Sequence, residues 1–366
     1  MKQGKSLMEL GGELQRQRKS RKDFIADSRS LKFHTQSNGI SILRISTDNK
    51  NYEFVISDIA HLQIASHLNI PARYYKKMQT DSPQLLDHNV NTLLETKSER
   101  RLIRTLDGKV RAFLSDHYRC LDNLELCAAV LPVVQEMKGA TIASCDLTSE
   151  RLYLKVINKR LKAEVDKNDM VQAGYVVSNS EVGLGSLSVE PLIYRQFYKN
   201  GLICKEFSIK KYHVGRPVHH SDADAYELYS ESIVSQDDRA FFKKVQDVVR
   251  AAIDESKFQL ILNKLRQAKQ IPLAYAPIKV VQSLADNIQL SQQEQKQILH
   301  QLLLSGDYSR YGLMNAVTTA SQLSTTYERA TELERIGGEI LSMNIPRHLI
   351  TTHSSHEDIM PALATA

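Results

Sequence analysis

The sequence predicts an α+β fold, in which a mostly antiparallel sheet with packed helices is followed by a helical C-terminal domain. From about residue 31 to residue 215, short runs of β-branched or alternating apolar residues are separated by turn residues, as is typical of antiparallel strands. Beyond residue 221, apolar residues recur at helical spacing instead. A chain of 366 residues with 42% hydrophobic and 25% charged residues also exceeds the usual size of one core, which indicates two domains.

The strand-forming runs follow one another through the first half of the chain. In order they are SILRIST, YEFVIS, RLIRTLD, VRAFLSD, TIASCDL, RLYLKVI, YVVSNS and LICKEFSI. The dipeptide Asp107-Gly108 favours a hairpin between the third and fourth runs. One helix interrupts the runs, with Asp58 as its N-cap and its end before Pro71, and a second is expected over residues 124 to 137.

The second half of the chain predicts helices. Apolar residues at helical spacing cover residues 241 to 252, 258 to 265, 278 to 288, 292 to 304 and 312 to 341. Pro272 and Pro277 break the pattern, and HVGRPVHHSDADA has the composition of a linker. We therefore expect a basic N-terminal segment (1–30), an α+β domain (31–220), a helical domain (221–345) and a flexible tail (346–366).

Composition excludes several classes of protein. No apolar run approaches the roughly eighteen residues that span a bilayer, and no signal peptide is recognisable, so we expect a cytoplasmic protein with no membrane partner. The four cysteines show neither C-x-x-C spacing nor the density of a disulfide framework. We expect no cofactor and no structural metal. That expectation includes the polar residues crowded in the linker, His219, His220, Asp222 and Asp224.

The positive charge of the chain is unevenly distributed. The formal net charge is +6. Residues 1 to 35 hold nine Lys or Arg against four Asp or Glu, and residues 195 to 216 hold six against one. Both segments are therefore strongly basic while the remainder of the chain is acidic. This asymmetry is the first indication of function.

Basic and aromatic residues alternate over residues 194 to 216. Single-stranded nucleic acid is held by such a combination of stacking rings and phosphate-neutralising charge. The alternative is an ordinary strand, with aromatic side chains in the core and solvated cations on the other face. A second basic group lies on or beside the two strands joined at Asp107-Gly108. The predicted nucleic-acid contacts are Arg101, Arg104, Lys109, Arg111, Arg195, Tyr198, Lys199, Lys205, Lys210, Lys211, Tyr212 and Arg216.

Acidic residues near strand ends support a hypothesis of another class. Asp116, Asp122 and Glu181 could assemble the divalent-metal site of a nuclease or nucleotide-processing enzyme. The same acids also suit turns and helix caps, because Asp122 directly precedes a predicted helix. We favour the capping role and assign no catalytic residue.

The run SNSEVGLG holds Gly183 and Gly185 beside small hydroxyl residues. It matches neither the G-x-x-x-x-G-K-[ST] phosphate loop nor a G-x-G-x-x-G between a strand and a helix. Asn and Gly tolerate positive φ, and Ser bonds to nearby backbone, so the run suits a turn or bulge. We interpret it as a structural hairpin rather than a phosphate-binding nest, and expect residues 174 to 209 to form strands of one sheet.

Separated phrases of the chain carry a resemblance to a known family. They are VRAFLSDHYRCLDN, YLKVIN, GYVVSNSEVGLGSLSVEPLIYR, KNGLIC, and YGLMNAVTTA with ERATELERIGG. Together they resemble a phage- and plasmid-borne family known only as domain of unknown function 932, over roughly residues 31 to 341. The resemblance implies an origin in a mobile element and a place among replication, recombination or host-interaction genes. It implies no reaction.

We therefore expect a phage or mobile-element protein that binds nucleic acid, above all single-stranded DNA, in replication or recombination. Annealing or protecting strands needs a basic groove and self-association rather than an active site, so a homo-oligomer is expected. The alternatives are the metal-dependent enzyme described above and a host-directed protein-binding factor with the helical domain as its interface.

Overall fold

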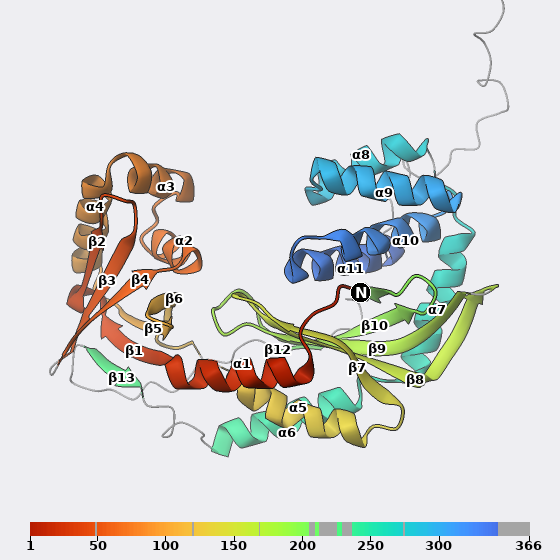
Figure 1. Ribbon diagram of the computed structural model, residues 1–366, viewed down its shortest axis with the longest axis horizontal. Coiled ribbons are helices and arrows are strands. Elements are labelled where there is room, and N and C mark those ends of the chain that lie inside the picture. The colour runs from red at the N-terminus through yellow and green to blue at the C-terminus, as the bar shows by residue number, and fades with distance from the viewer. Residues whose placement is uncertain are drawn as a thin grey trace, which may run out of the picture.

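The structure is a computed structural model that describes residues 1–47, 50–118, 121–167, 169–204, 209–211, 225–228, 236–273 and 275–342. Within residues 209–211, 225–228 and 236–239 it describes the backbone only. Largely antiparallel sheets and a helical C-terminal region confirm the predicted α+β class. The expectation of one sheet was wrong, because the strands divide between a seven-stranded and a six-stranded sheet (Figure 1).

The seven-stranded sheet has the order β13-β1-β5-β6-β4-β3-β2. Its strands are β1 (Lys22–Asp27), β2 (Leu31–Thr35), β3 (Ser41–Ser46), β4 (Asn51–Ile56), β5 (Arg100–Leu106), β6 (Lys109–Ser115) and β13 (Ala225–Leu228). Neighbours pair antiparallel except β4 and β6, which are parallel. Strand β13 pairs with β1, so this sheet includes a strand from beyond residue 220, the expected end of the α+β domain.

Three helices cover one face of this sheet. They are α2 (Asp58–His67), α3 (Ala72–Asp81) and α4 (Pro83–Thr96). Ile64 of α2 and Val90 of α4 are buried against Phe33 in one core cluster. The N-cap of α2 is Ser57, whose hydroxyl accepts from the Ala60 N–H, and not Asp58 as expected. The predicted hairpin is confirmed between β5 and β6, with positive φ at both turn residues.

The six-stranded sheet has the order β11-β10-β9-β8-β7, with β12 also paired to β10. Its strands are β7 (Ala140–Leu147), β8 (Leu152–Asp166), β9 (Asp169–Asn179), β10 (Leu187–Arg195), β11 (Asn200–Ile203) and β12 (Ile209–Lys211). The strands between residues 174 and 209 therefore belong to one sheet, as predicted. The long β8–β9 and β9–β10 hairpins bury Tyr175 and Val177 completely.

Five helices of the C-terminal region pack beside this sheet (Figure 1). They are α7 (Glu255–Lys269), α8 (Pro277–Ile288), α9 (Gln292–Ser305), α10 (Arg310–Ala320) and α11 (Tyr327–Ser342). One prediction needs correction, because the helical pattern over residues 312 to 341 is interrupted between α10 and α11 by the short helix Ser321–Leu323. The Ser321 hydroxyl bonds the Thr318 carbonyl there, and hydroxyl residues compete in this way with helical bonding.

A buried ion pair joins α11 to the six-stranded sheet. The Lys155 Nζ of β8 lies 2.6 Å from the Glu334 Oε2 of α11, and both side chains are 0% exposed. Burial lowers the pKa of Lys155, although Glu334 opposes this effect. The next residue of α11, Arg335, pairs with Glu190 of β10 at 2.6 Å.

Helices α1 (Leu7–Ser20), α5 (Asn123–Glu136) and α6 (Gln236–Arg250) lie together along the base of the molecule in Figure 1. Leu14, Val130 and Val249 of these helices share a core cluster with the six-stranded sheet. The expected N-terminal segment is thus part of the fold, because α1 leads directly into β1. In the part of the chain that the structure describes, helices that could cross a bilayer are absent.

Candidate functional site

The two sheets meet at a network of arginines and carboxylates centred on Arg104 of β5. Its fully buried guanidinium donates to Asp23 Oδ2 of β1 at 3.1 Å and to Asp122 Oδ1 at 3.3 Å. It also donates to the Glu181 carbonyl, in the connection between β9 and β10, at 3.0 Å. A buried cation with these partners links the two sheets and cannot reach a phosphate in solvent. The prediction of Arg104 as a nucleic-acid contact was therefore wrong.

Arg111 of β6, another predicted contact, belongs to the same network. Its guanidinium forms an ion pair with the Glu181 carboxylate, which also accepts from the Asn123 N–H at 2.6 Å. Burial alone would raise the pKa of Glu181, but Arg111 and Arg104 lower it to about 2. Glu181 is therefore a structural anion at neutral pH.

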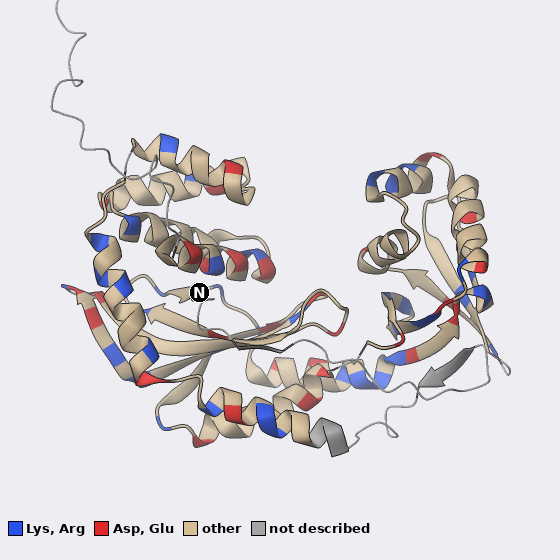
Figure 2. Cartoon of the chain, turned by 180° about the vertical axis from the view of Figure 1, so that it is seen from behind, with Lys and Arg blue, Asp and Glu red and all other residues tan. Residues whose placement is uncertain are grey.

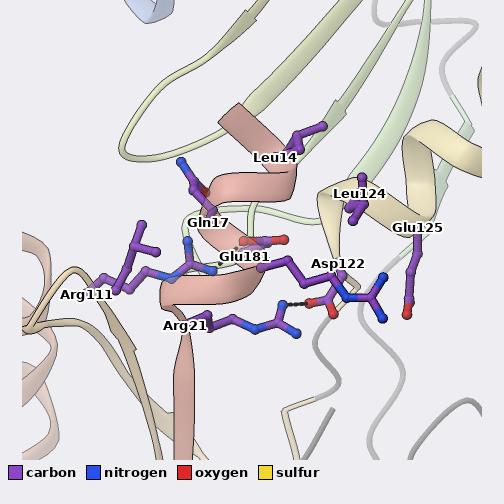
Figure 3. Close-up of a pocket in the computed structure, with 10 residues that line it drawn as sticks. Leu14, Gln17, Arg21, Arg111, Asp122, Leu124, Glu125 and Glu181 are labelled. Atoms are coloured by element: carbon purple, nitrogen blue, oxygen red, sulfur yellow. Dashed lines mark hydrogen bonds and ion pairs between the residues drawn. The ribbon is translucent and has the colours of Figure 1, made fainter. Parts of the chain in front are cut away.

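A pocket of about 250 Å³ lies beside this network, against α1 (Figure 3). Arg21 reaches Asp122 across it, with 2.5 Å between Nη1 and Oδ1. Its charged lining consists of Arg18, Arg21, Arg111, Asp122, Glu125 and Glu181. Because three cations face three carboxylates, the lining offers no excess charge to an anion or a metal ion.

The acids of the enzyme hypothesis do not converge. Asp122 and Glu181 line the pocket, whereas Asp116 lies at the end of β6 beside His117, with 3.8 Å between Oδ1 and Nε2. In the ranges that the structure describes, no three His, Cys, Asp or Glu side chains are grouped so that they could hold a metal ion. Asp122 is the N-cap residue of α5, as expected, but its carboxylate bonds arginines instead of helical N–H groups. The linker residues His219, His220, Asp222 and Asp224 lie outside the described residues.

The connection between β9 and β10, residues 180–186, docks onto the seven-stranded sheet. The hairpin interpretation is confirmed, because the two strands pair antiparallel along their length. Val182 is 1% exposed and packs with Leu102 and Leu114 of the other sheet. Gln63 of α2 donates to the Val182 carbonyl at 2.7 Å. The connection therefore fastens one sheet to the other.

Replacing Gly183 by Val should lower the free energy of unfolding by about 1–3 kcal/mol. Gly183 has a φ of +78°, and a Cβ there would lie 2.6 Å from Leu114 Cδ2. Gly39→Val is the matched control, because Gly39 has a φ of +80° but its added Cβ would meet nothing closer than 3.9 Å. Thermal unfolding of both variants should show the larger loss for Gly183→Val. Equal losses would mean that only the backbone conformation matters and that the docking contact is irrelevant.

The structure describes three side chains among the predicted contacts of residues 194 to 216. Arg195 is 3% exposed and forms an ion pair with Asp169, whose carboxylate also accepts from the Tyr311 hydroxyl. Arg195 as a phosphate contact was therefore wrong. Tyr198 is 38% exposed and Lys199 is exposed. The remaining predicted contacts lie outside the described residues, namely Lys205, Tyr212, Arg216 and the side chains of Lys210 and Lys211.

The last two predicted contacts differ from each other. Arg101 is largely buried, with its guanidinium 5.1 Å from the Phe113 ring centroid and its Nη1 3.8 Å from Glu99 Oε2. Lys109, by contrast, is exposed and has no carboxylate partner among the described residues. Of the basic residues predicted on the β5–β6 hairpin, Lys109 is the one suited to contact a phosphate.

Further exposed cations gather near Lys109, around the β5–β6 turn. We define the turn-end surface as Arg18, Lys19, Lys22, Lys50 and Lys109. All five are exposed, and within the described ranges none has a carboxylate partner. Figure 2 shows Lys and Arg at the end of α1 that meets the seven-stranded sheet. This is a basic surface at one corner of the molecule.

Contacts around the turn bring these residues together. The turn residue Asp107 pairs with Arg16 at 2.7 Å and accepts from the Ser20 hydroxyl at 2.5 Å, which fixes the end of α1 beside the turn. Lys22 pairs with Thr105 in the adjoining strand. The Nζ atoms of Lys22 and Lys50 lie 5.5 Å and 5.2 Å from the ring centroid of Tyr52. Arg16 also pairs with Glu13 at 2.8 Å, so it offsets one of these two carboxylates, and the five cations of the turn-end surface still leave a positive excess.

Sequence reasoning identified Lys109 individually but missed the other four cations of the turn-end surface. The basic excess of residues 1 to 35 was the available signal, but Lys50 and Lys109 join that segment only through strand pairing. The chain matches no protein-family model, no curated protein and no solved structure.

Proposed function

We propose that this protein binds nucleic acid, above all single-stranded DNA, and that it anneals or protects strands in the replication or recombination of a phage or other mobile element. The turn-end surface is the observation that carries the proposal. Five exposed cations on one corner create a field that attracts the phosphate backbone, and each contact releases counterions. The mobile-element setting rests on the family resemblance of the sequence.

Exposed aromatic rings at the turn between β10 and β11 of the six-stranded sheet favour the binding of single strands over that of duplexes. Phe197 is 72% exposed and Tyr198 38% exposed, with their ring centroids 4.9 Å apart. Lys199 follows them in the same turn between β10 and β11 and is also exposed. Unpaired bases stack on such rings, whereas bases inside a duplex are already stacked on one another.

Binding of a host protein is a second candidate, favoured by a different observation. Large apolar side chains are exposed in and beside the α8–α9 helix pair. They are Tyr275 (46%), Ile278 (55%), Leu303 (52%), Leu304 (69%) and Tyr308 (47%). Exposed apolar side chains mark protein interfaces where they form one contiguous patch, and these five belong to neighbouring helices and the segments beside them.

Fluorescence anisotropy with labelled single-stranded DNA should show an affinity that falls steeply with salt, with a log–log slope of about −0.7 per phosphate contact. Replacing Lys19, Lys22 and Lys109 together by Ala should make the slope shallower by about 2, because three contacts are lost. The matched control replaces three exposed lysines outside the turn-end surface, Lys162, Lys279 and Lys296. It removes the same charge and should leave the slope almost unchanged.

The Phe197→Ala variant separates stacking from charge. It should weaken binding by about 1–3 kcal/mol for each stacked base and leave the salt slope unchanged, because stacking releases no counterions. A folded wild-type protein that binds no strand at low salt would contradict the proposed function and favour the host-protein candidate.

A further inference from the structure

A second pocket lies where α2 meets the connection between β9 and β10. It has a volume of about 640 Å³, within the range of sites that hold small ligands. Its lining comes from α2, from β5 and β6, and from Glu150 and Leu184 of the other sheet's connections. Both sheets therefore contribute to one cavity.

Apolar side chains line this pocket, and they come from elements of both sheets. Leu62 of α2 is 59% exposed and Leu184 of the 180–186 connection is 37% exposed. Ile59 and Leu114 add to the same lining. Exposed leucines on both sides of a cavity favour a ligand with apolar faces.

Two nitrogen atoms of the lining residues lack hydrogen-bond partners among the described residues. The His67 side chain is 6% exposed, and its Nε2 is buried without a partner. Its Nδ1 lies 3.8 Å from Glu99 Oε2, too far for a hydrogen bond. The Nε of Arg101 is buried without a partner as well. Buried polar atoms are normally satisfied, so these two favour a polar ligand edge.

The lining carries no net charge. Arg101 is positive and Glu150 negative, and both line the pocket. Burial and then Arg101 lower the pKa of His67 to about 4, so its imidazole is neutral at pH 7. The exposed hydroxyls of Ser66 and Ser115 can donate or accept. These groups suit an uncharged ligand with donors and acceptors, and they do not suit a free phosphate or a metal ion.

We infer that this pocket binds a nucleobase, with its ring between Leu62 and Leu184 and its polar edge toward His67 and Arg101. A nucleobase is flat and uncharged, with apolar faces and an edge of donors and acceptors, and proteins hold unpaired bases through both features. A free nucleoside and an unpaired base of a strand present the same chemistry. The inference does not depend on the turn-end surface, because the two sites share no residue.

The absence of Trp from the chain permits a direct test. Leu62→Trp places a single tryptophan at the pocket, and Leu303→Trp places one at a comparably exposed leucine of α9. Thymidine, deoxycytidine, deoxyadenosine or deoxyguanosine should quench the tryptophan fluorescence of the first variant saturably and leave that of the second unchanged. Saturation-transfer NMR with the same nucleosides should show binding to the wild type that Leu62→Ala weakens about tenfold.

The outcomes distinguish a free nucleoside from a base within a strand as the ligand. They also test the nucleobase pocket separately from the proposed binding of strands. Quenching of Leu62→Trp by a normal strand, but not by an abasic strand or free nucleosides, would support a site for a base within a strand. No saturable response to any nucleoside, together with equal responses to normal and abasic strands, would overturn the inference. Adding the Lys19, Lys22 and Lys109 replacements should weaken the binding of strands and make its salt dependence shallower, and should preserve quenching by nucleosides. Nucleoside quenching without strand binding would overturn the proposed function alone.

Discussion

Replacing Lys155 by Met should lower the free energy of unfolding by about 3–5 kcal/mol. The substitution leaves the Glu334 carboxylate buried after the cation 2.6 Å away has been removed. The other carboxylate oxygen of Glu334 is already without a hydrogen-bond partner among the described residues. An unpaired buried charge is costly, so the loss should be visible as a lower denaturation midpoint in circular dichroism.

Two control variants test this explanation. Lys155→Met combined with Glu334→Leu removes both charges and should recover most of the loss, because no buried ion then remains to be desolvated. Lys32 and Glu95 form a pair with the same 2.6 Å separation, but both side chains are 55% exposed. Lys32→Met should cost less than about 1 kcal/mol. Equal losses for Lys155→Met and Lys32→Met would refute the role of burial.

Replacing Arg104 by Met should also destabilise the protein by about 3–5 kcal/mol. It removes the donor to Asp23, to Asp122 and to the Glu181 carbonyl, and thereby the central link between the two sheets. We expect hydrogen exchange to accelerate at Val182, because the connection that carries it docks at this link. Slow exchange there in a destabilised variant would show that the connection docks without Arg104.

Arg44→Met is the matched control for Arg104→Met. Arg44 forms an ion pair with Glu53 at 2.5 Å on the same sheet, but the two side chains are 55% and 52% exposed. Since solvent screens an exposed pair, this change should cost less than about 1 kcal/mol. A loss comparable to that of Arg104→Met would contradict the importance of burial.

The Arg104 network also sets a pH dependence. The pKa of Glu181 falls from 4.5 to about 2 on folding, so its carboxylate stabilises the fold above pH 4.5. That contribution is lost as the pH falls from 4.5 towards 2. Removing Arg104 takes away one of the cations that lower the pKa, so Arg104→Met should begin to unfold at a higher pH than the wild type in an acid titration.

Local patterns predicted most helices and strands but not their grouping into sheets. The runs RLIRTLD and VRAFLSD became β5 and β6 because alternation and the Asp107-Gly108 turn are local signals. The parallel pairing of β4 with β6 and the pairing of β1 with β13 join segments far apart in the chain. Periodicity reports which side of a strand is buried, but it does not identify the neighbouring strand.

The candidate site shows the same limit at the level of single residues. Arg104 and Lys109 lie on one hairpin and carry the same charge, yet the first is fully buried and the second exposed. Burial of Arg104 depends on Asp23 and Asp122, which the fold brings to it from other elements. No pattern around Arg104 contains that information, so Arg104 and Lys109 were predicted alike.

The pairing of β1 with β13 has a consequence for synthesis on the ribosome. Asp23 emerges early, but its partner Leu228 is translated only after every strand of the six-stranded sheet. Until then, the nascent chain carries β1 with one edge open, and open edges recruit strands from other chains. Ribosomes that translate the same message therefore hold incomplete sheets close together. Once β13 has paired it becomes the edge of the sheet, and its four residues offer strands of other chains a shorter edge than the six residues of β1.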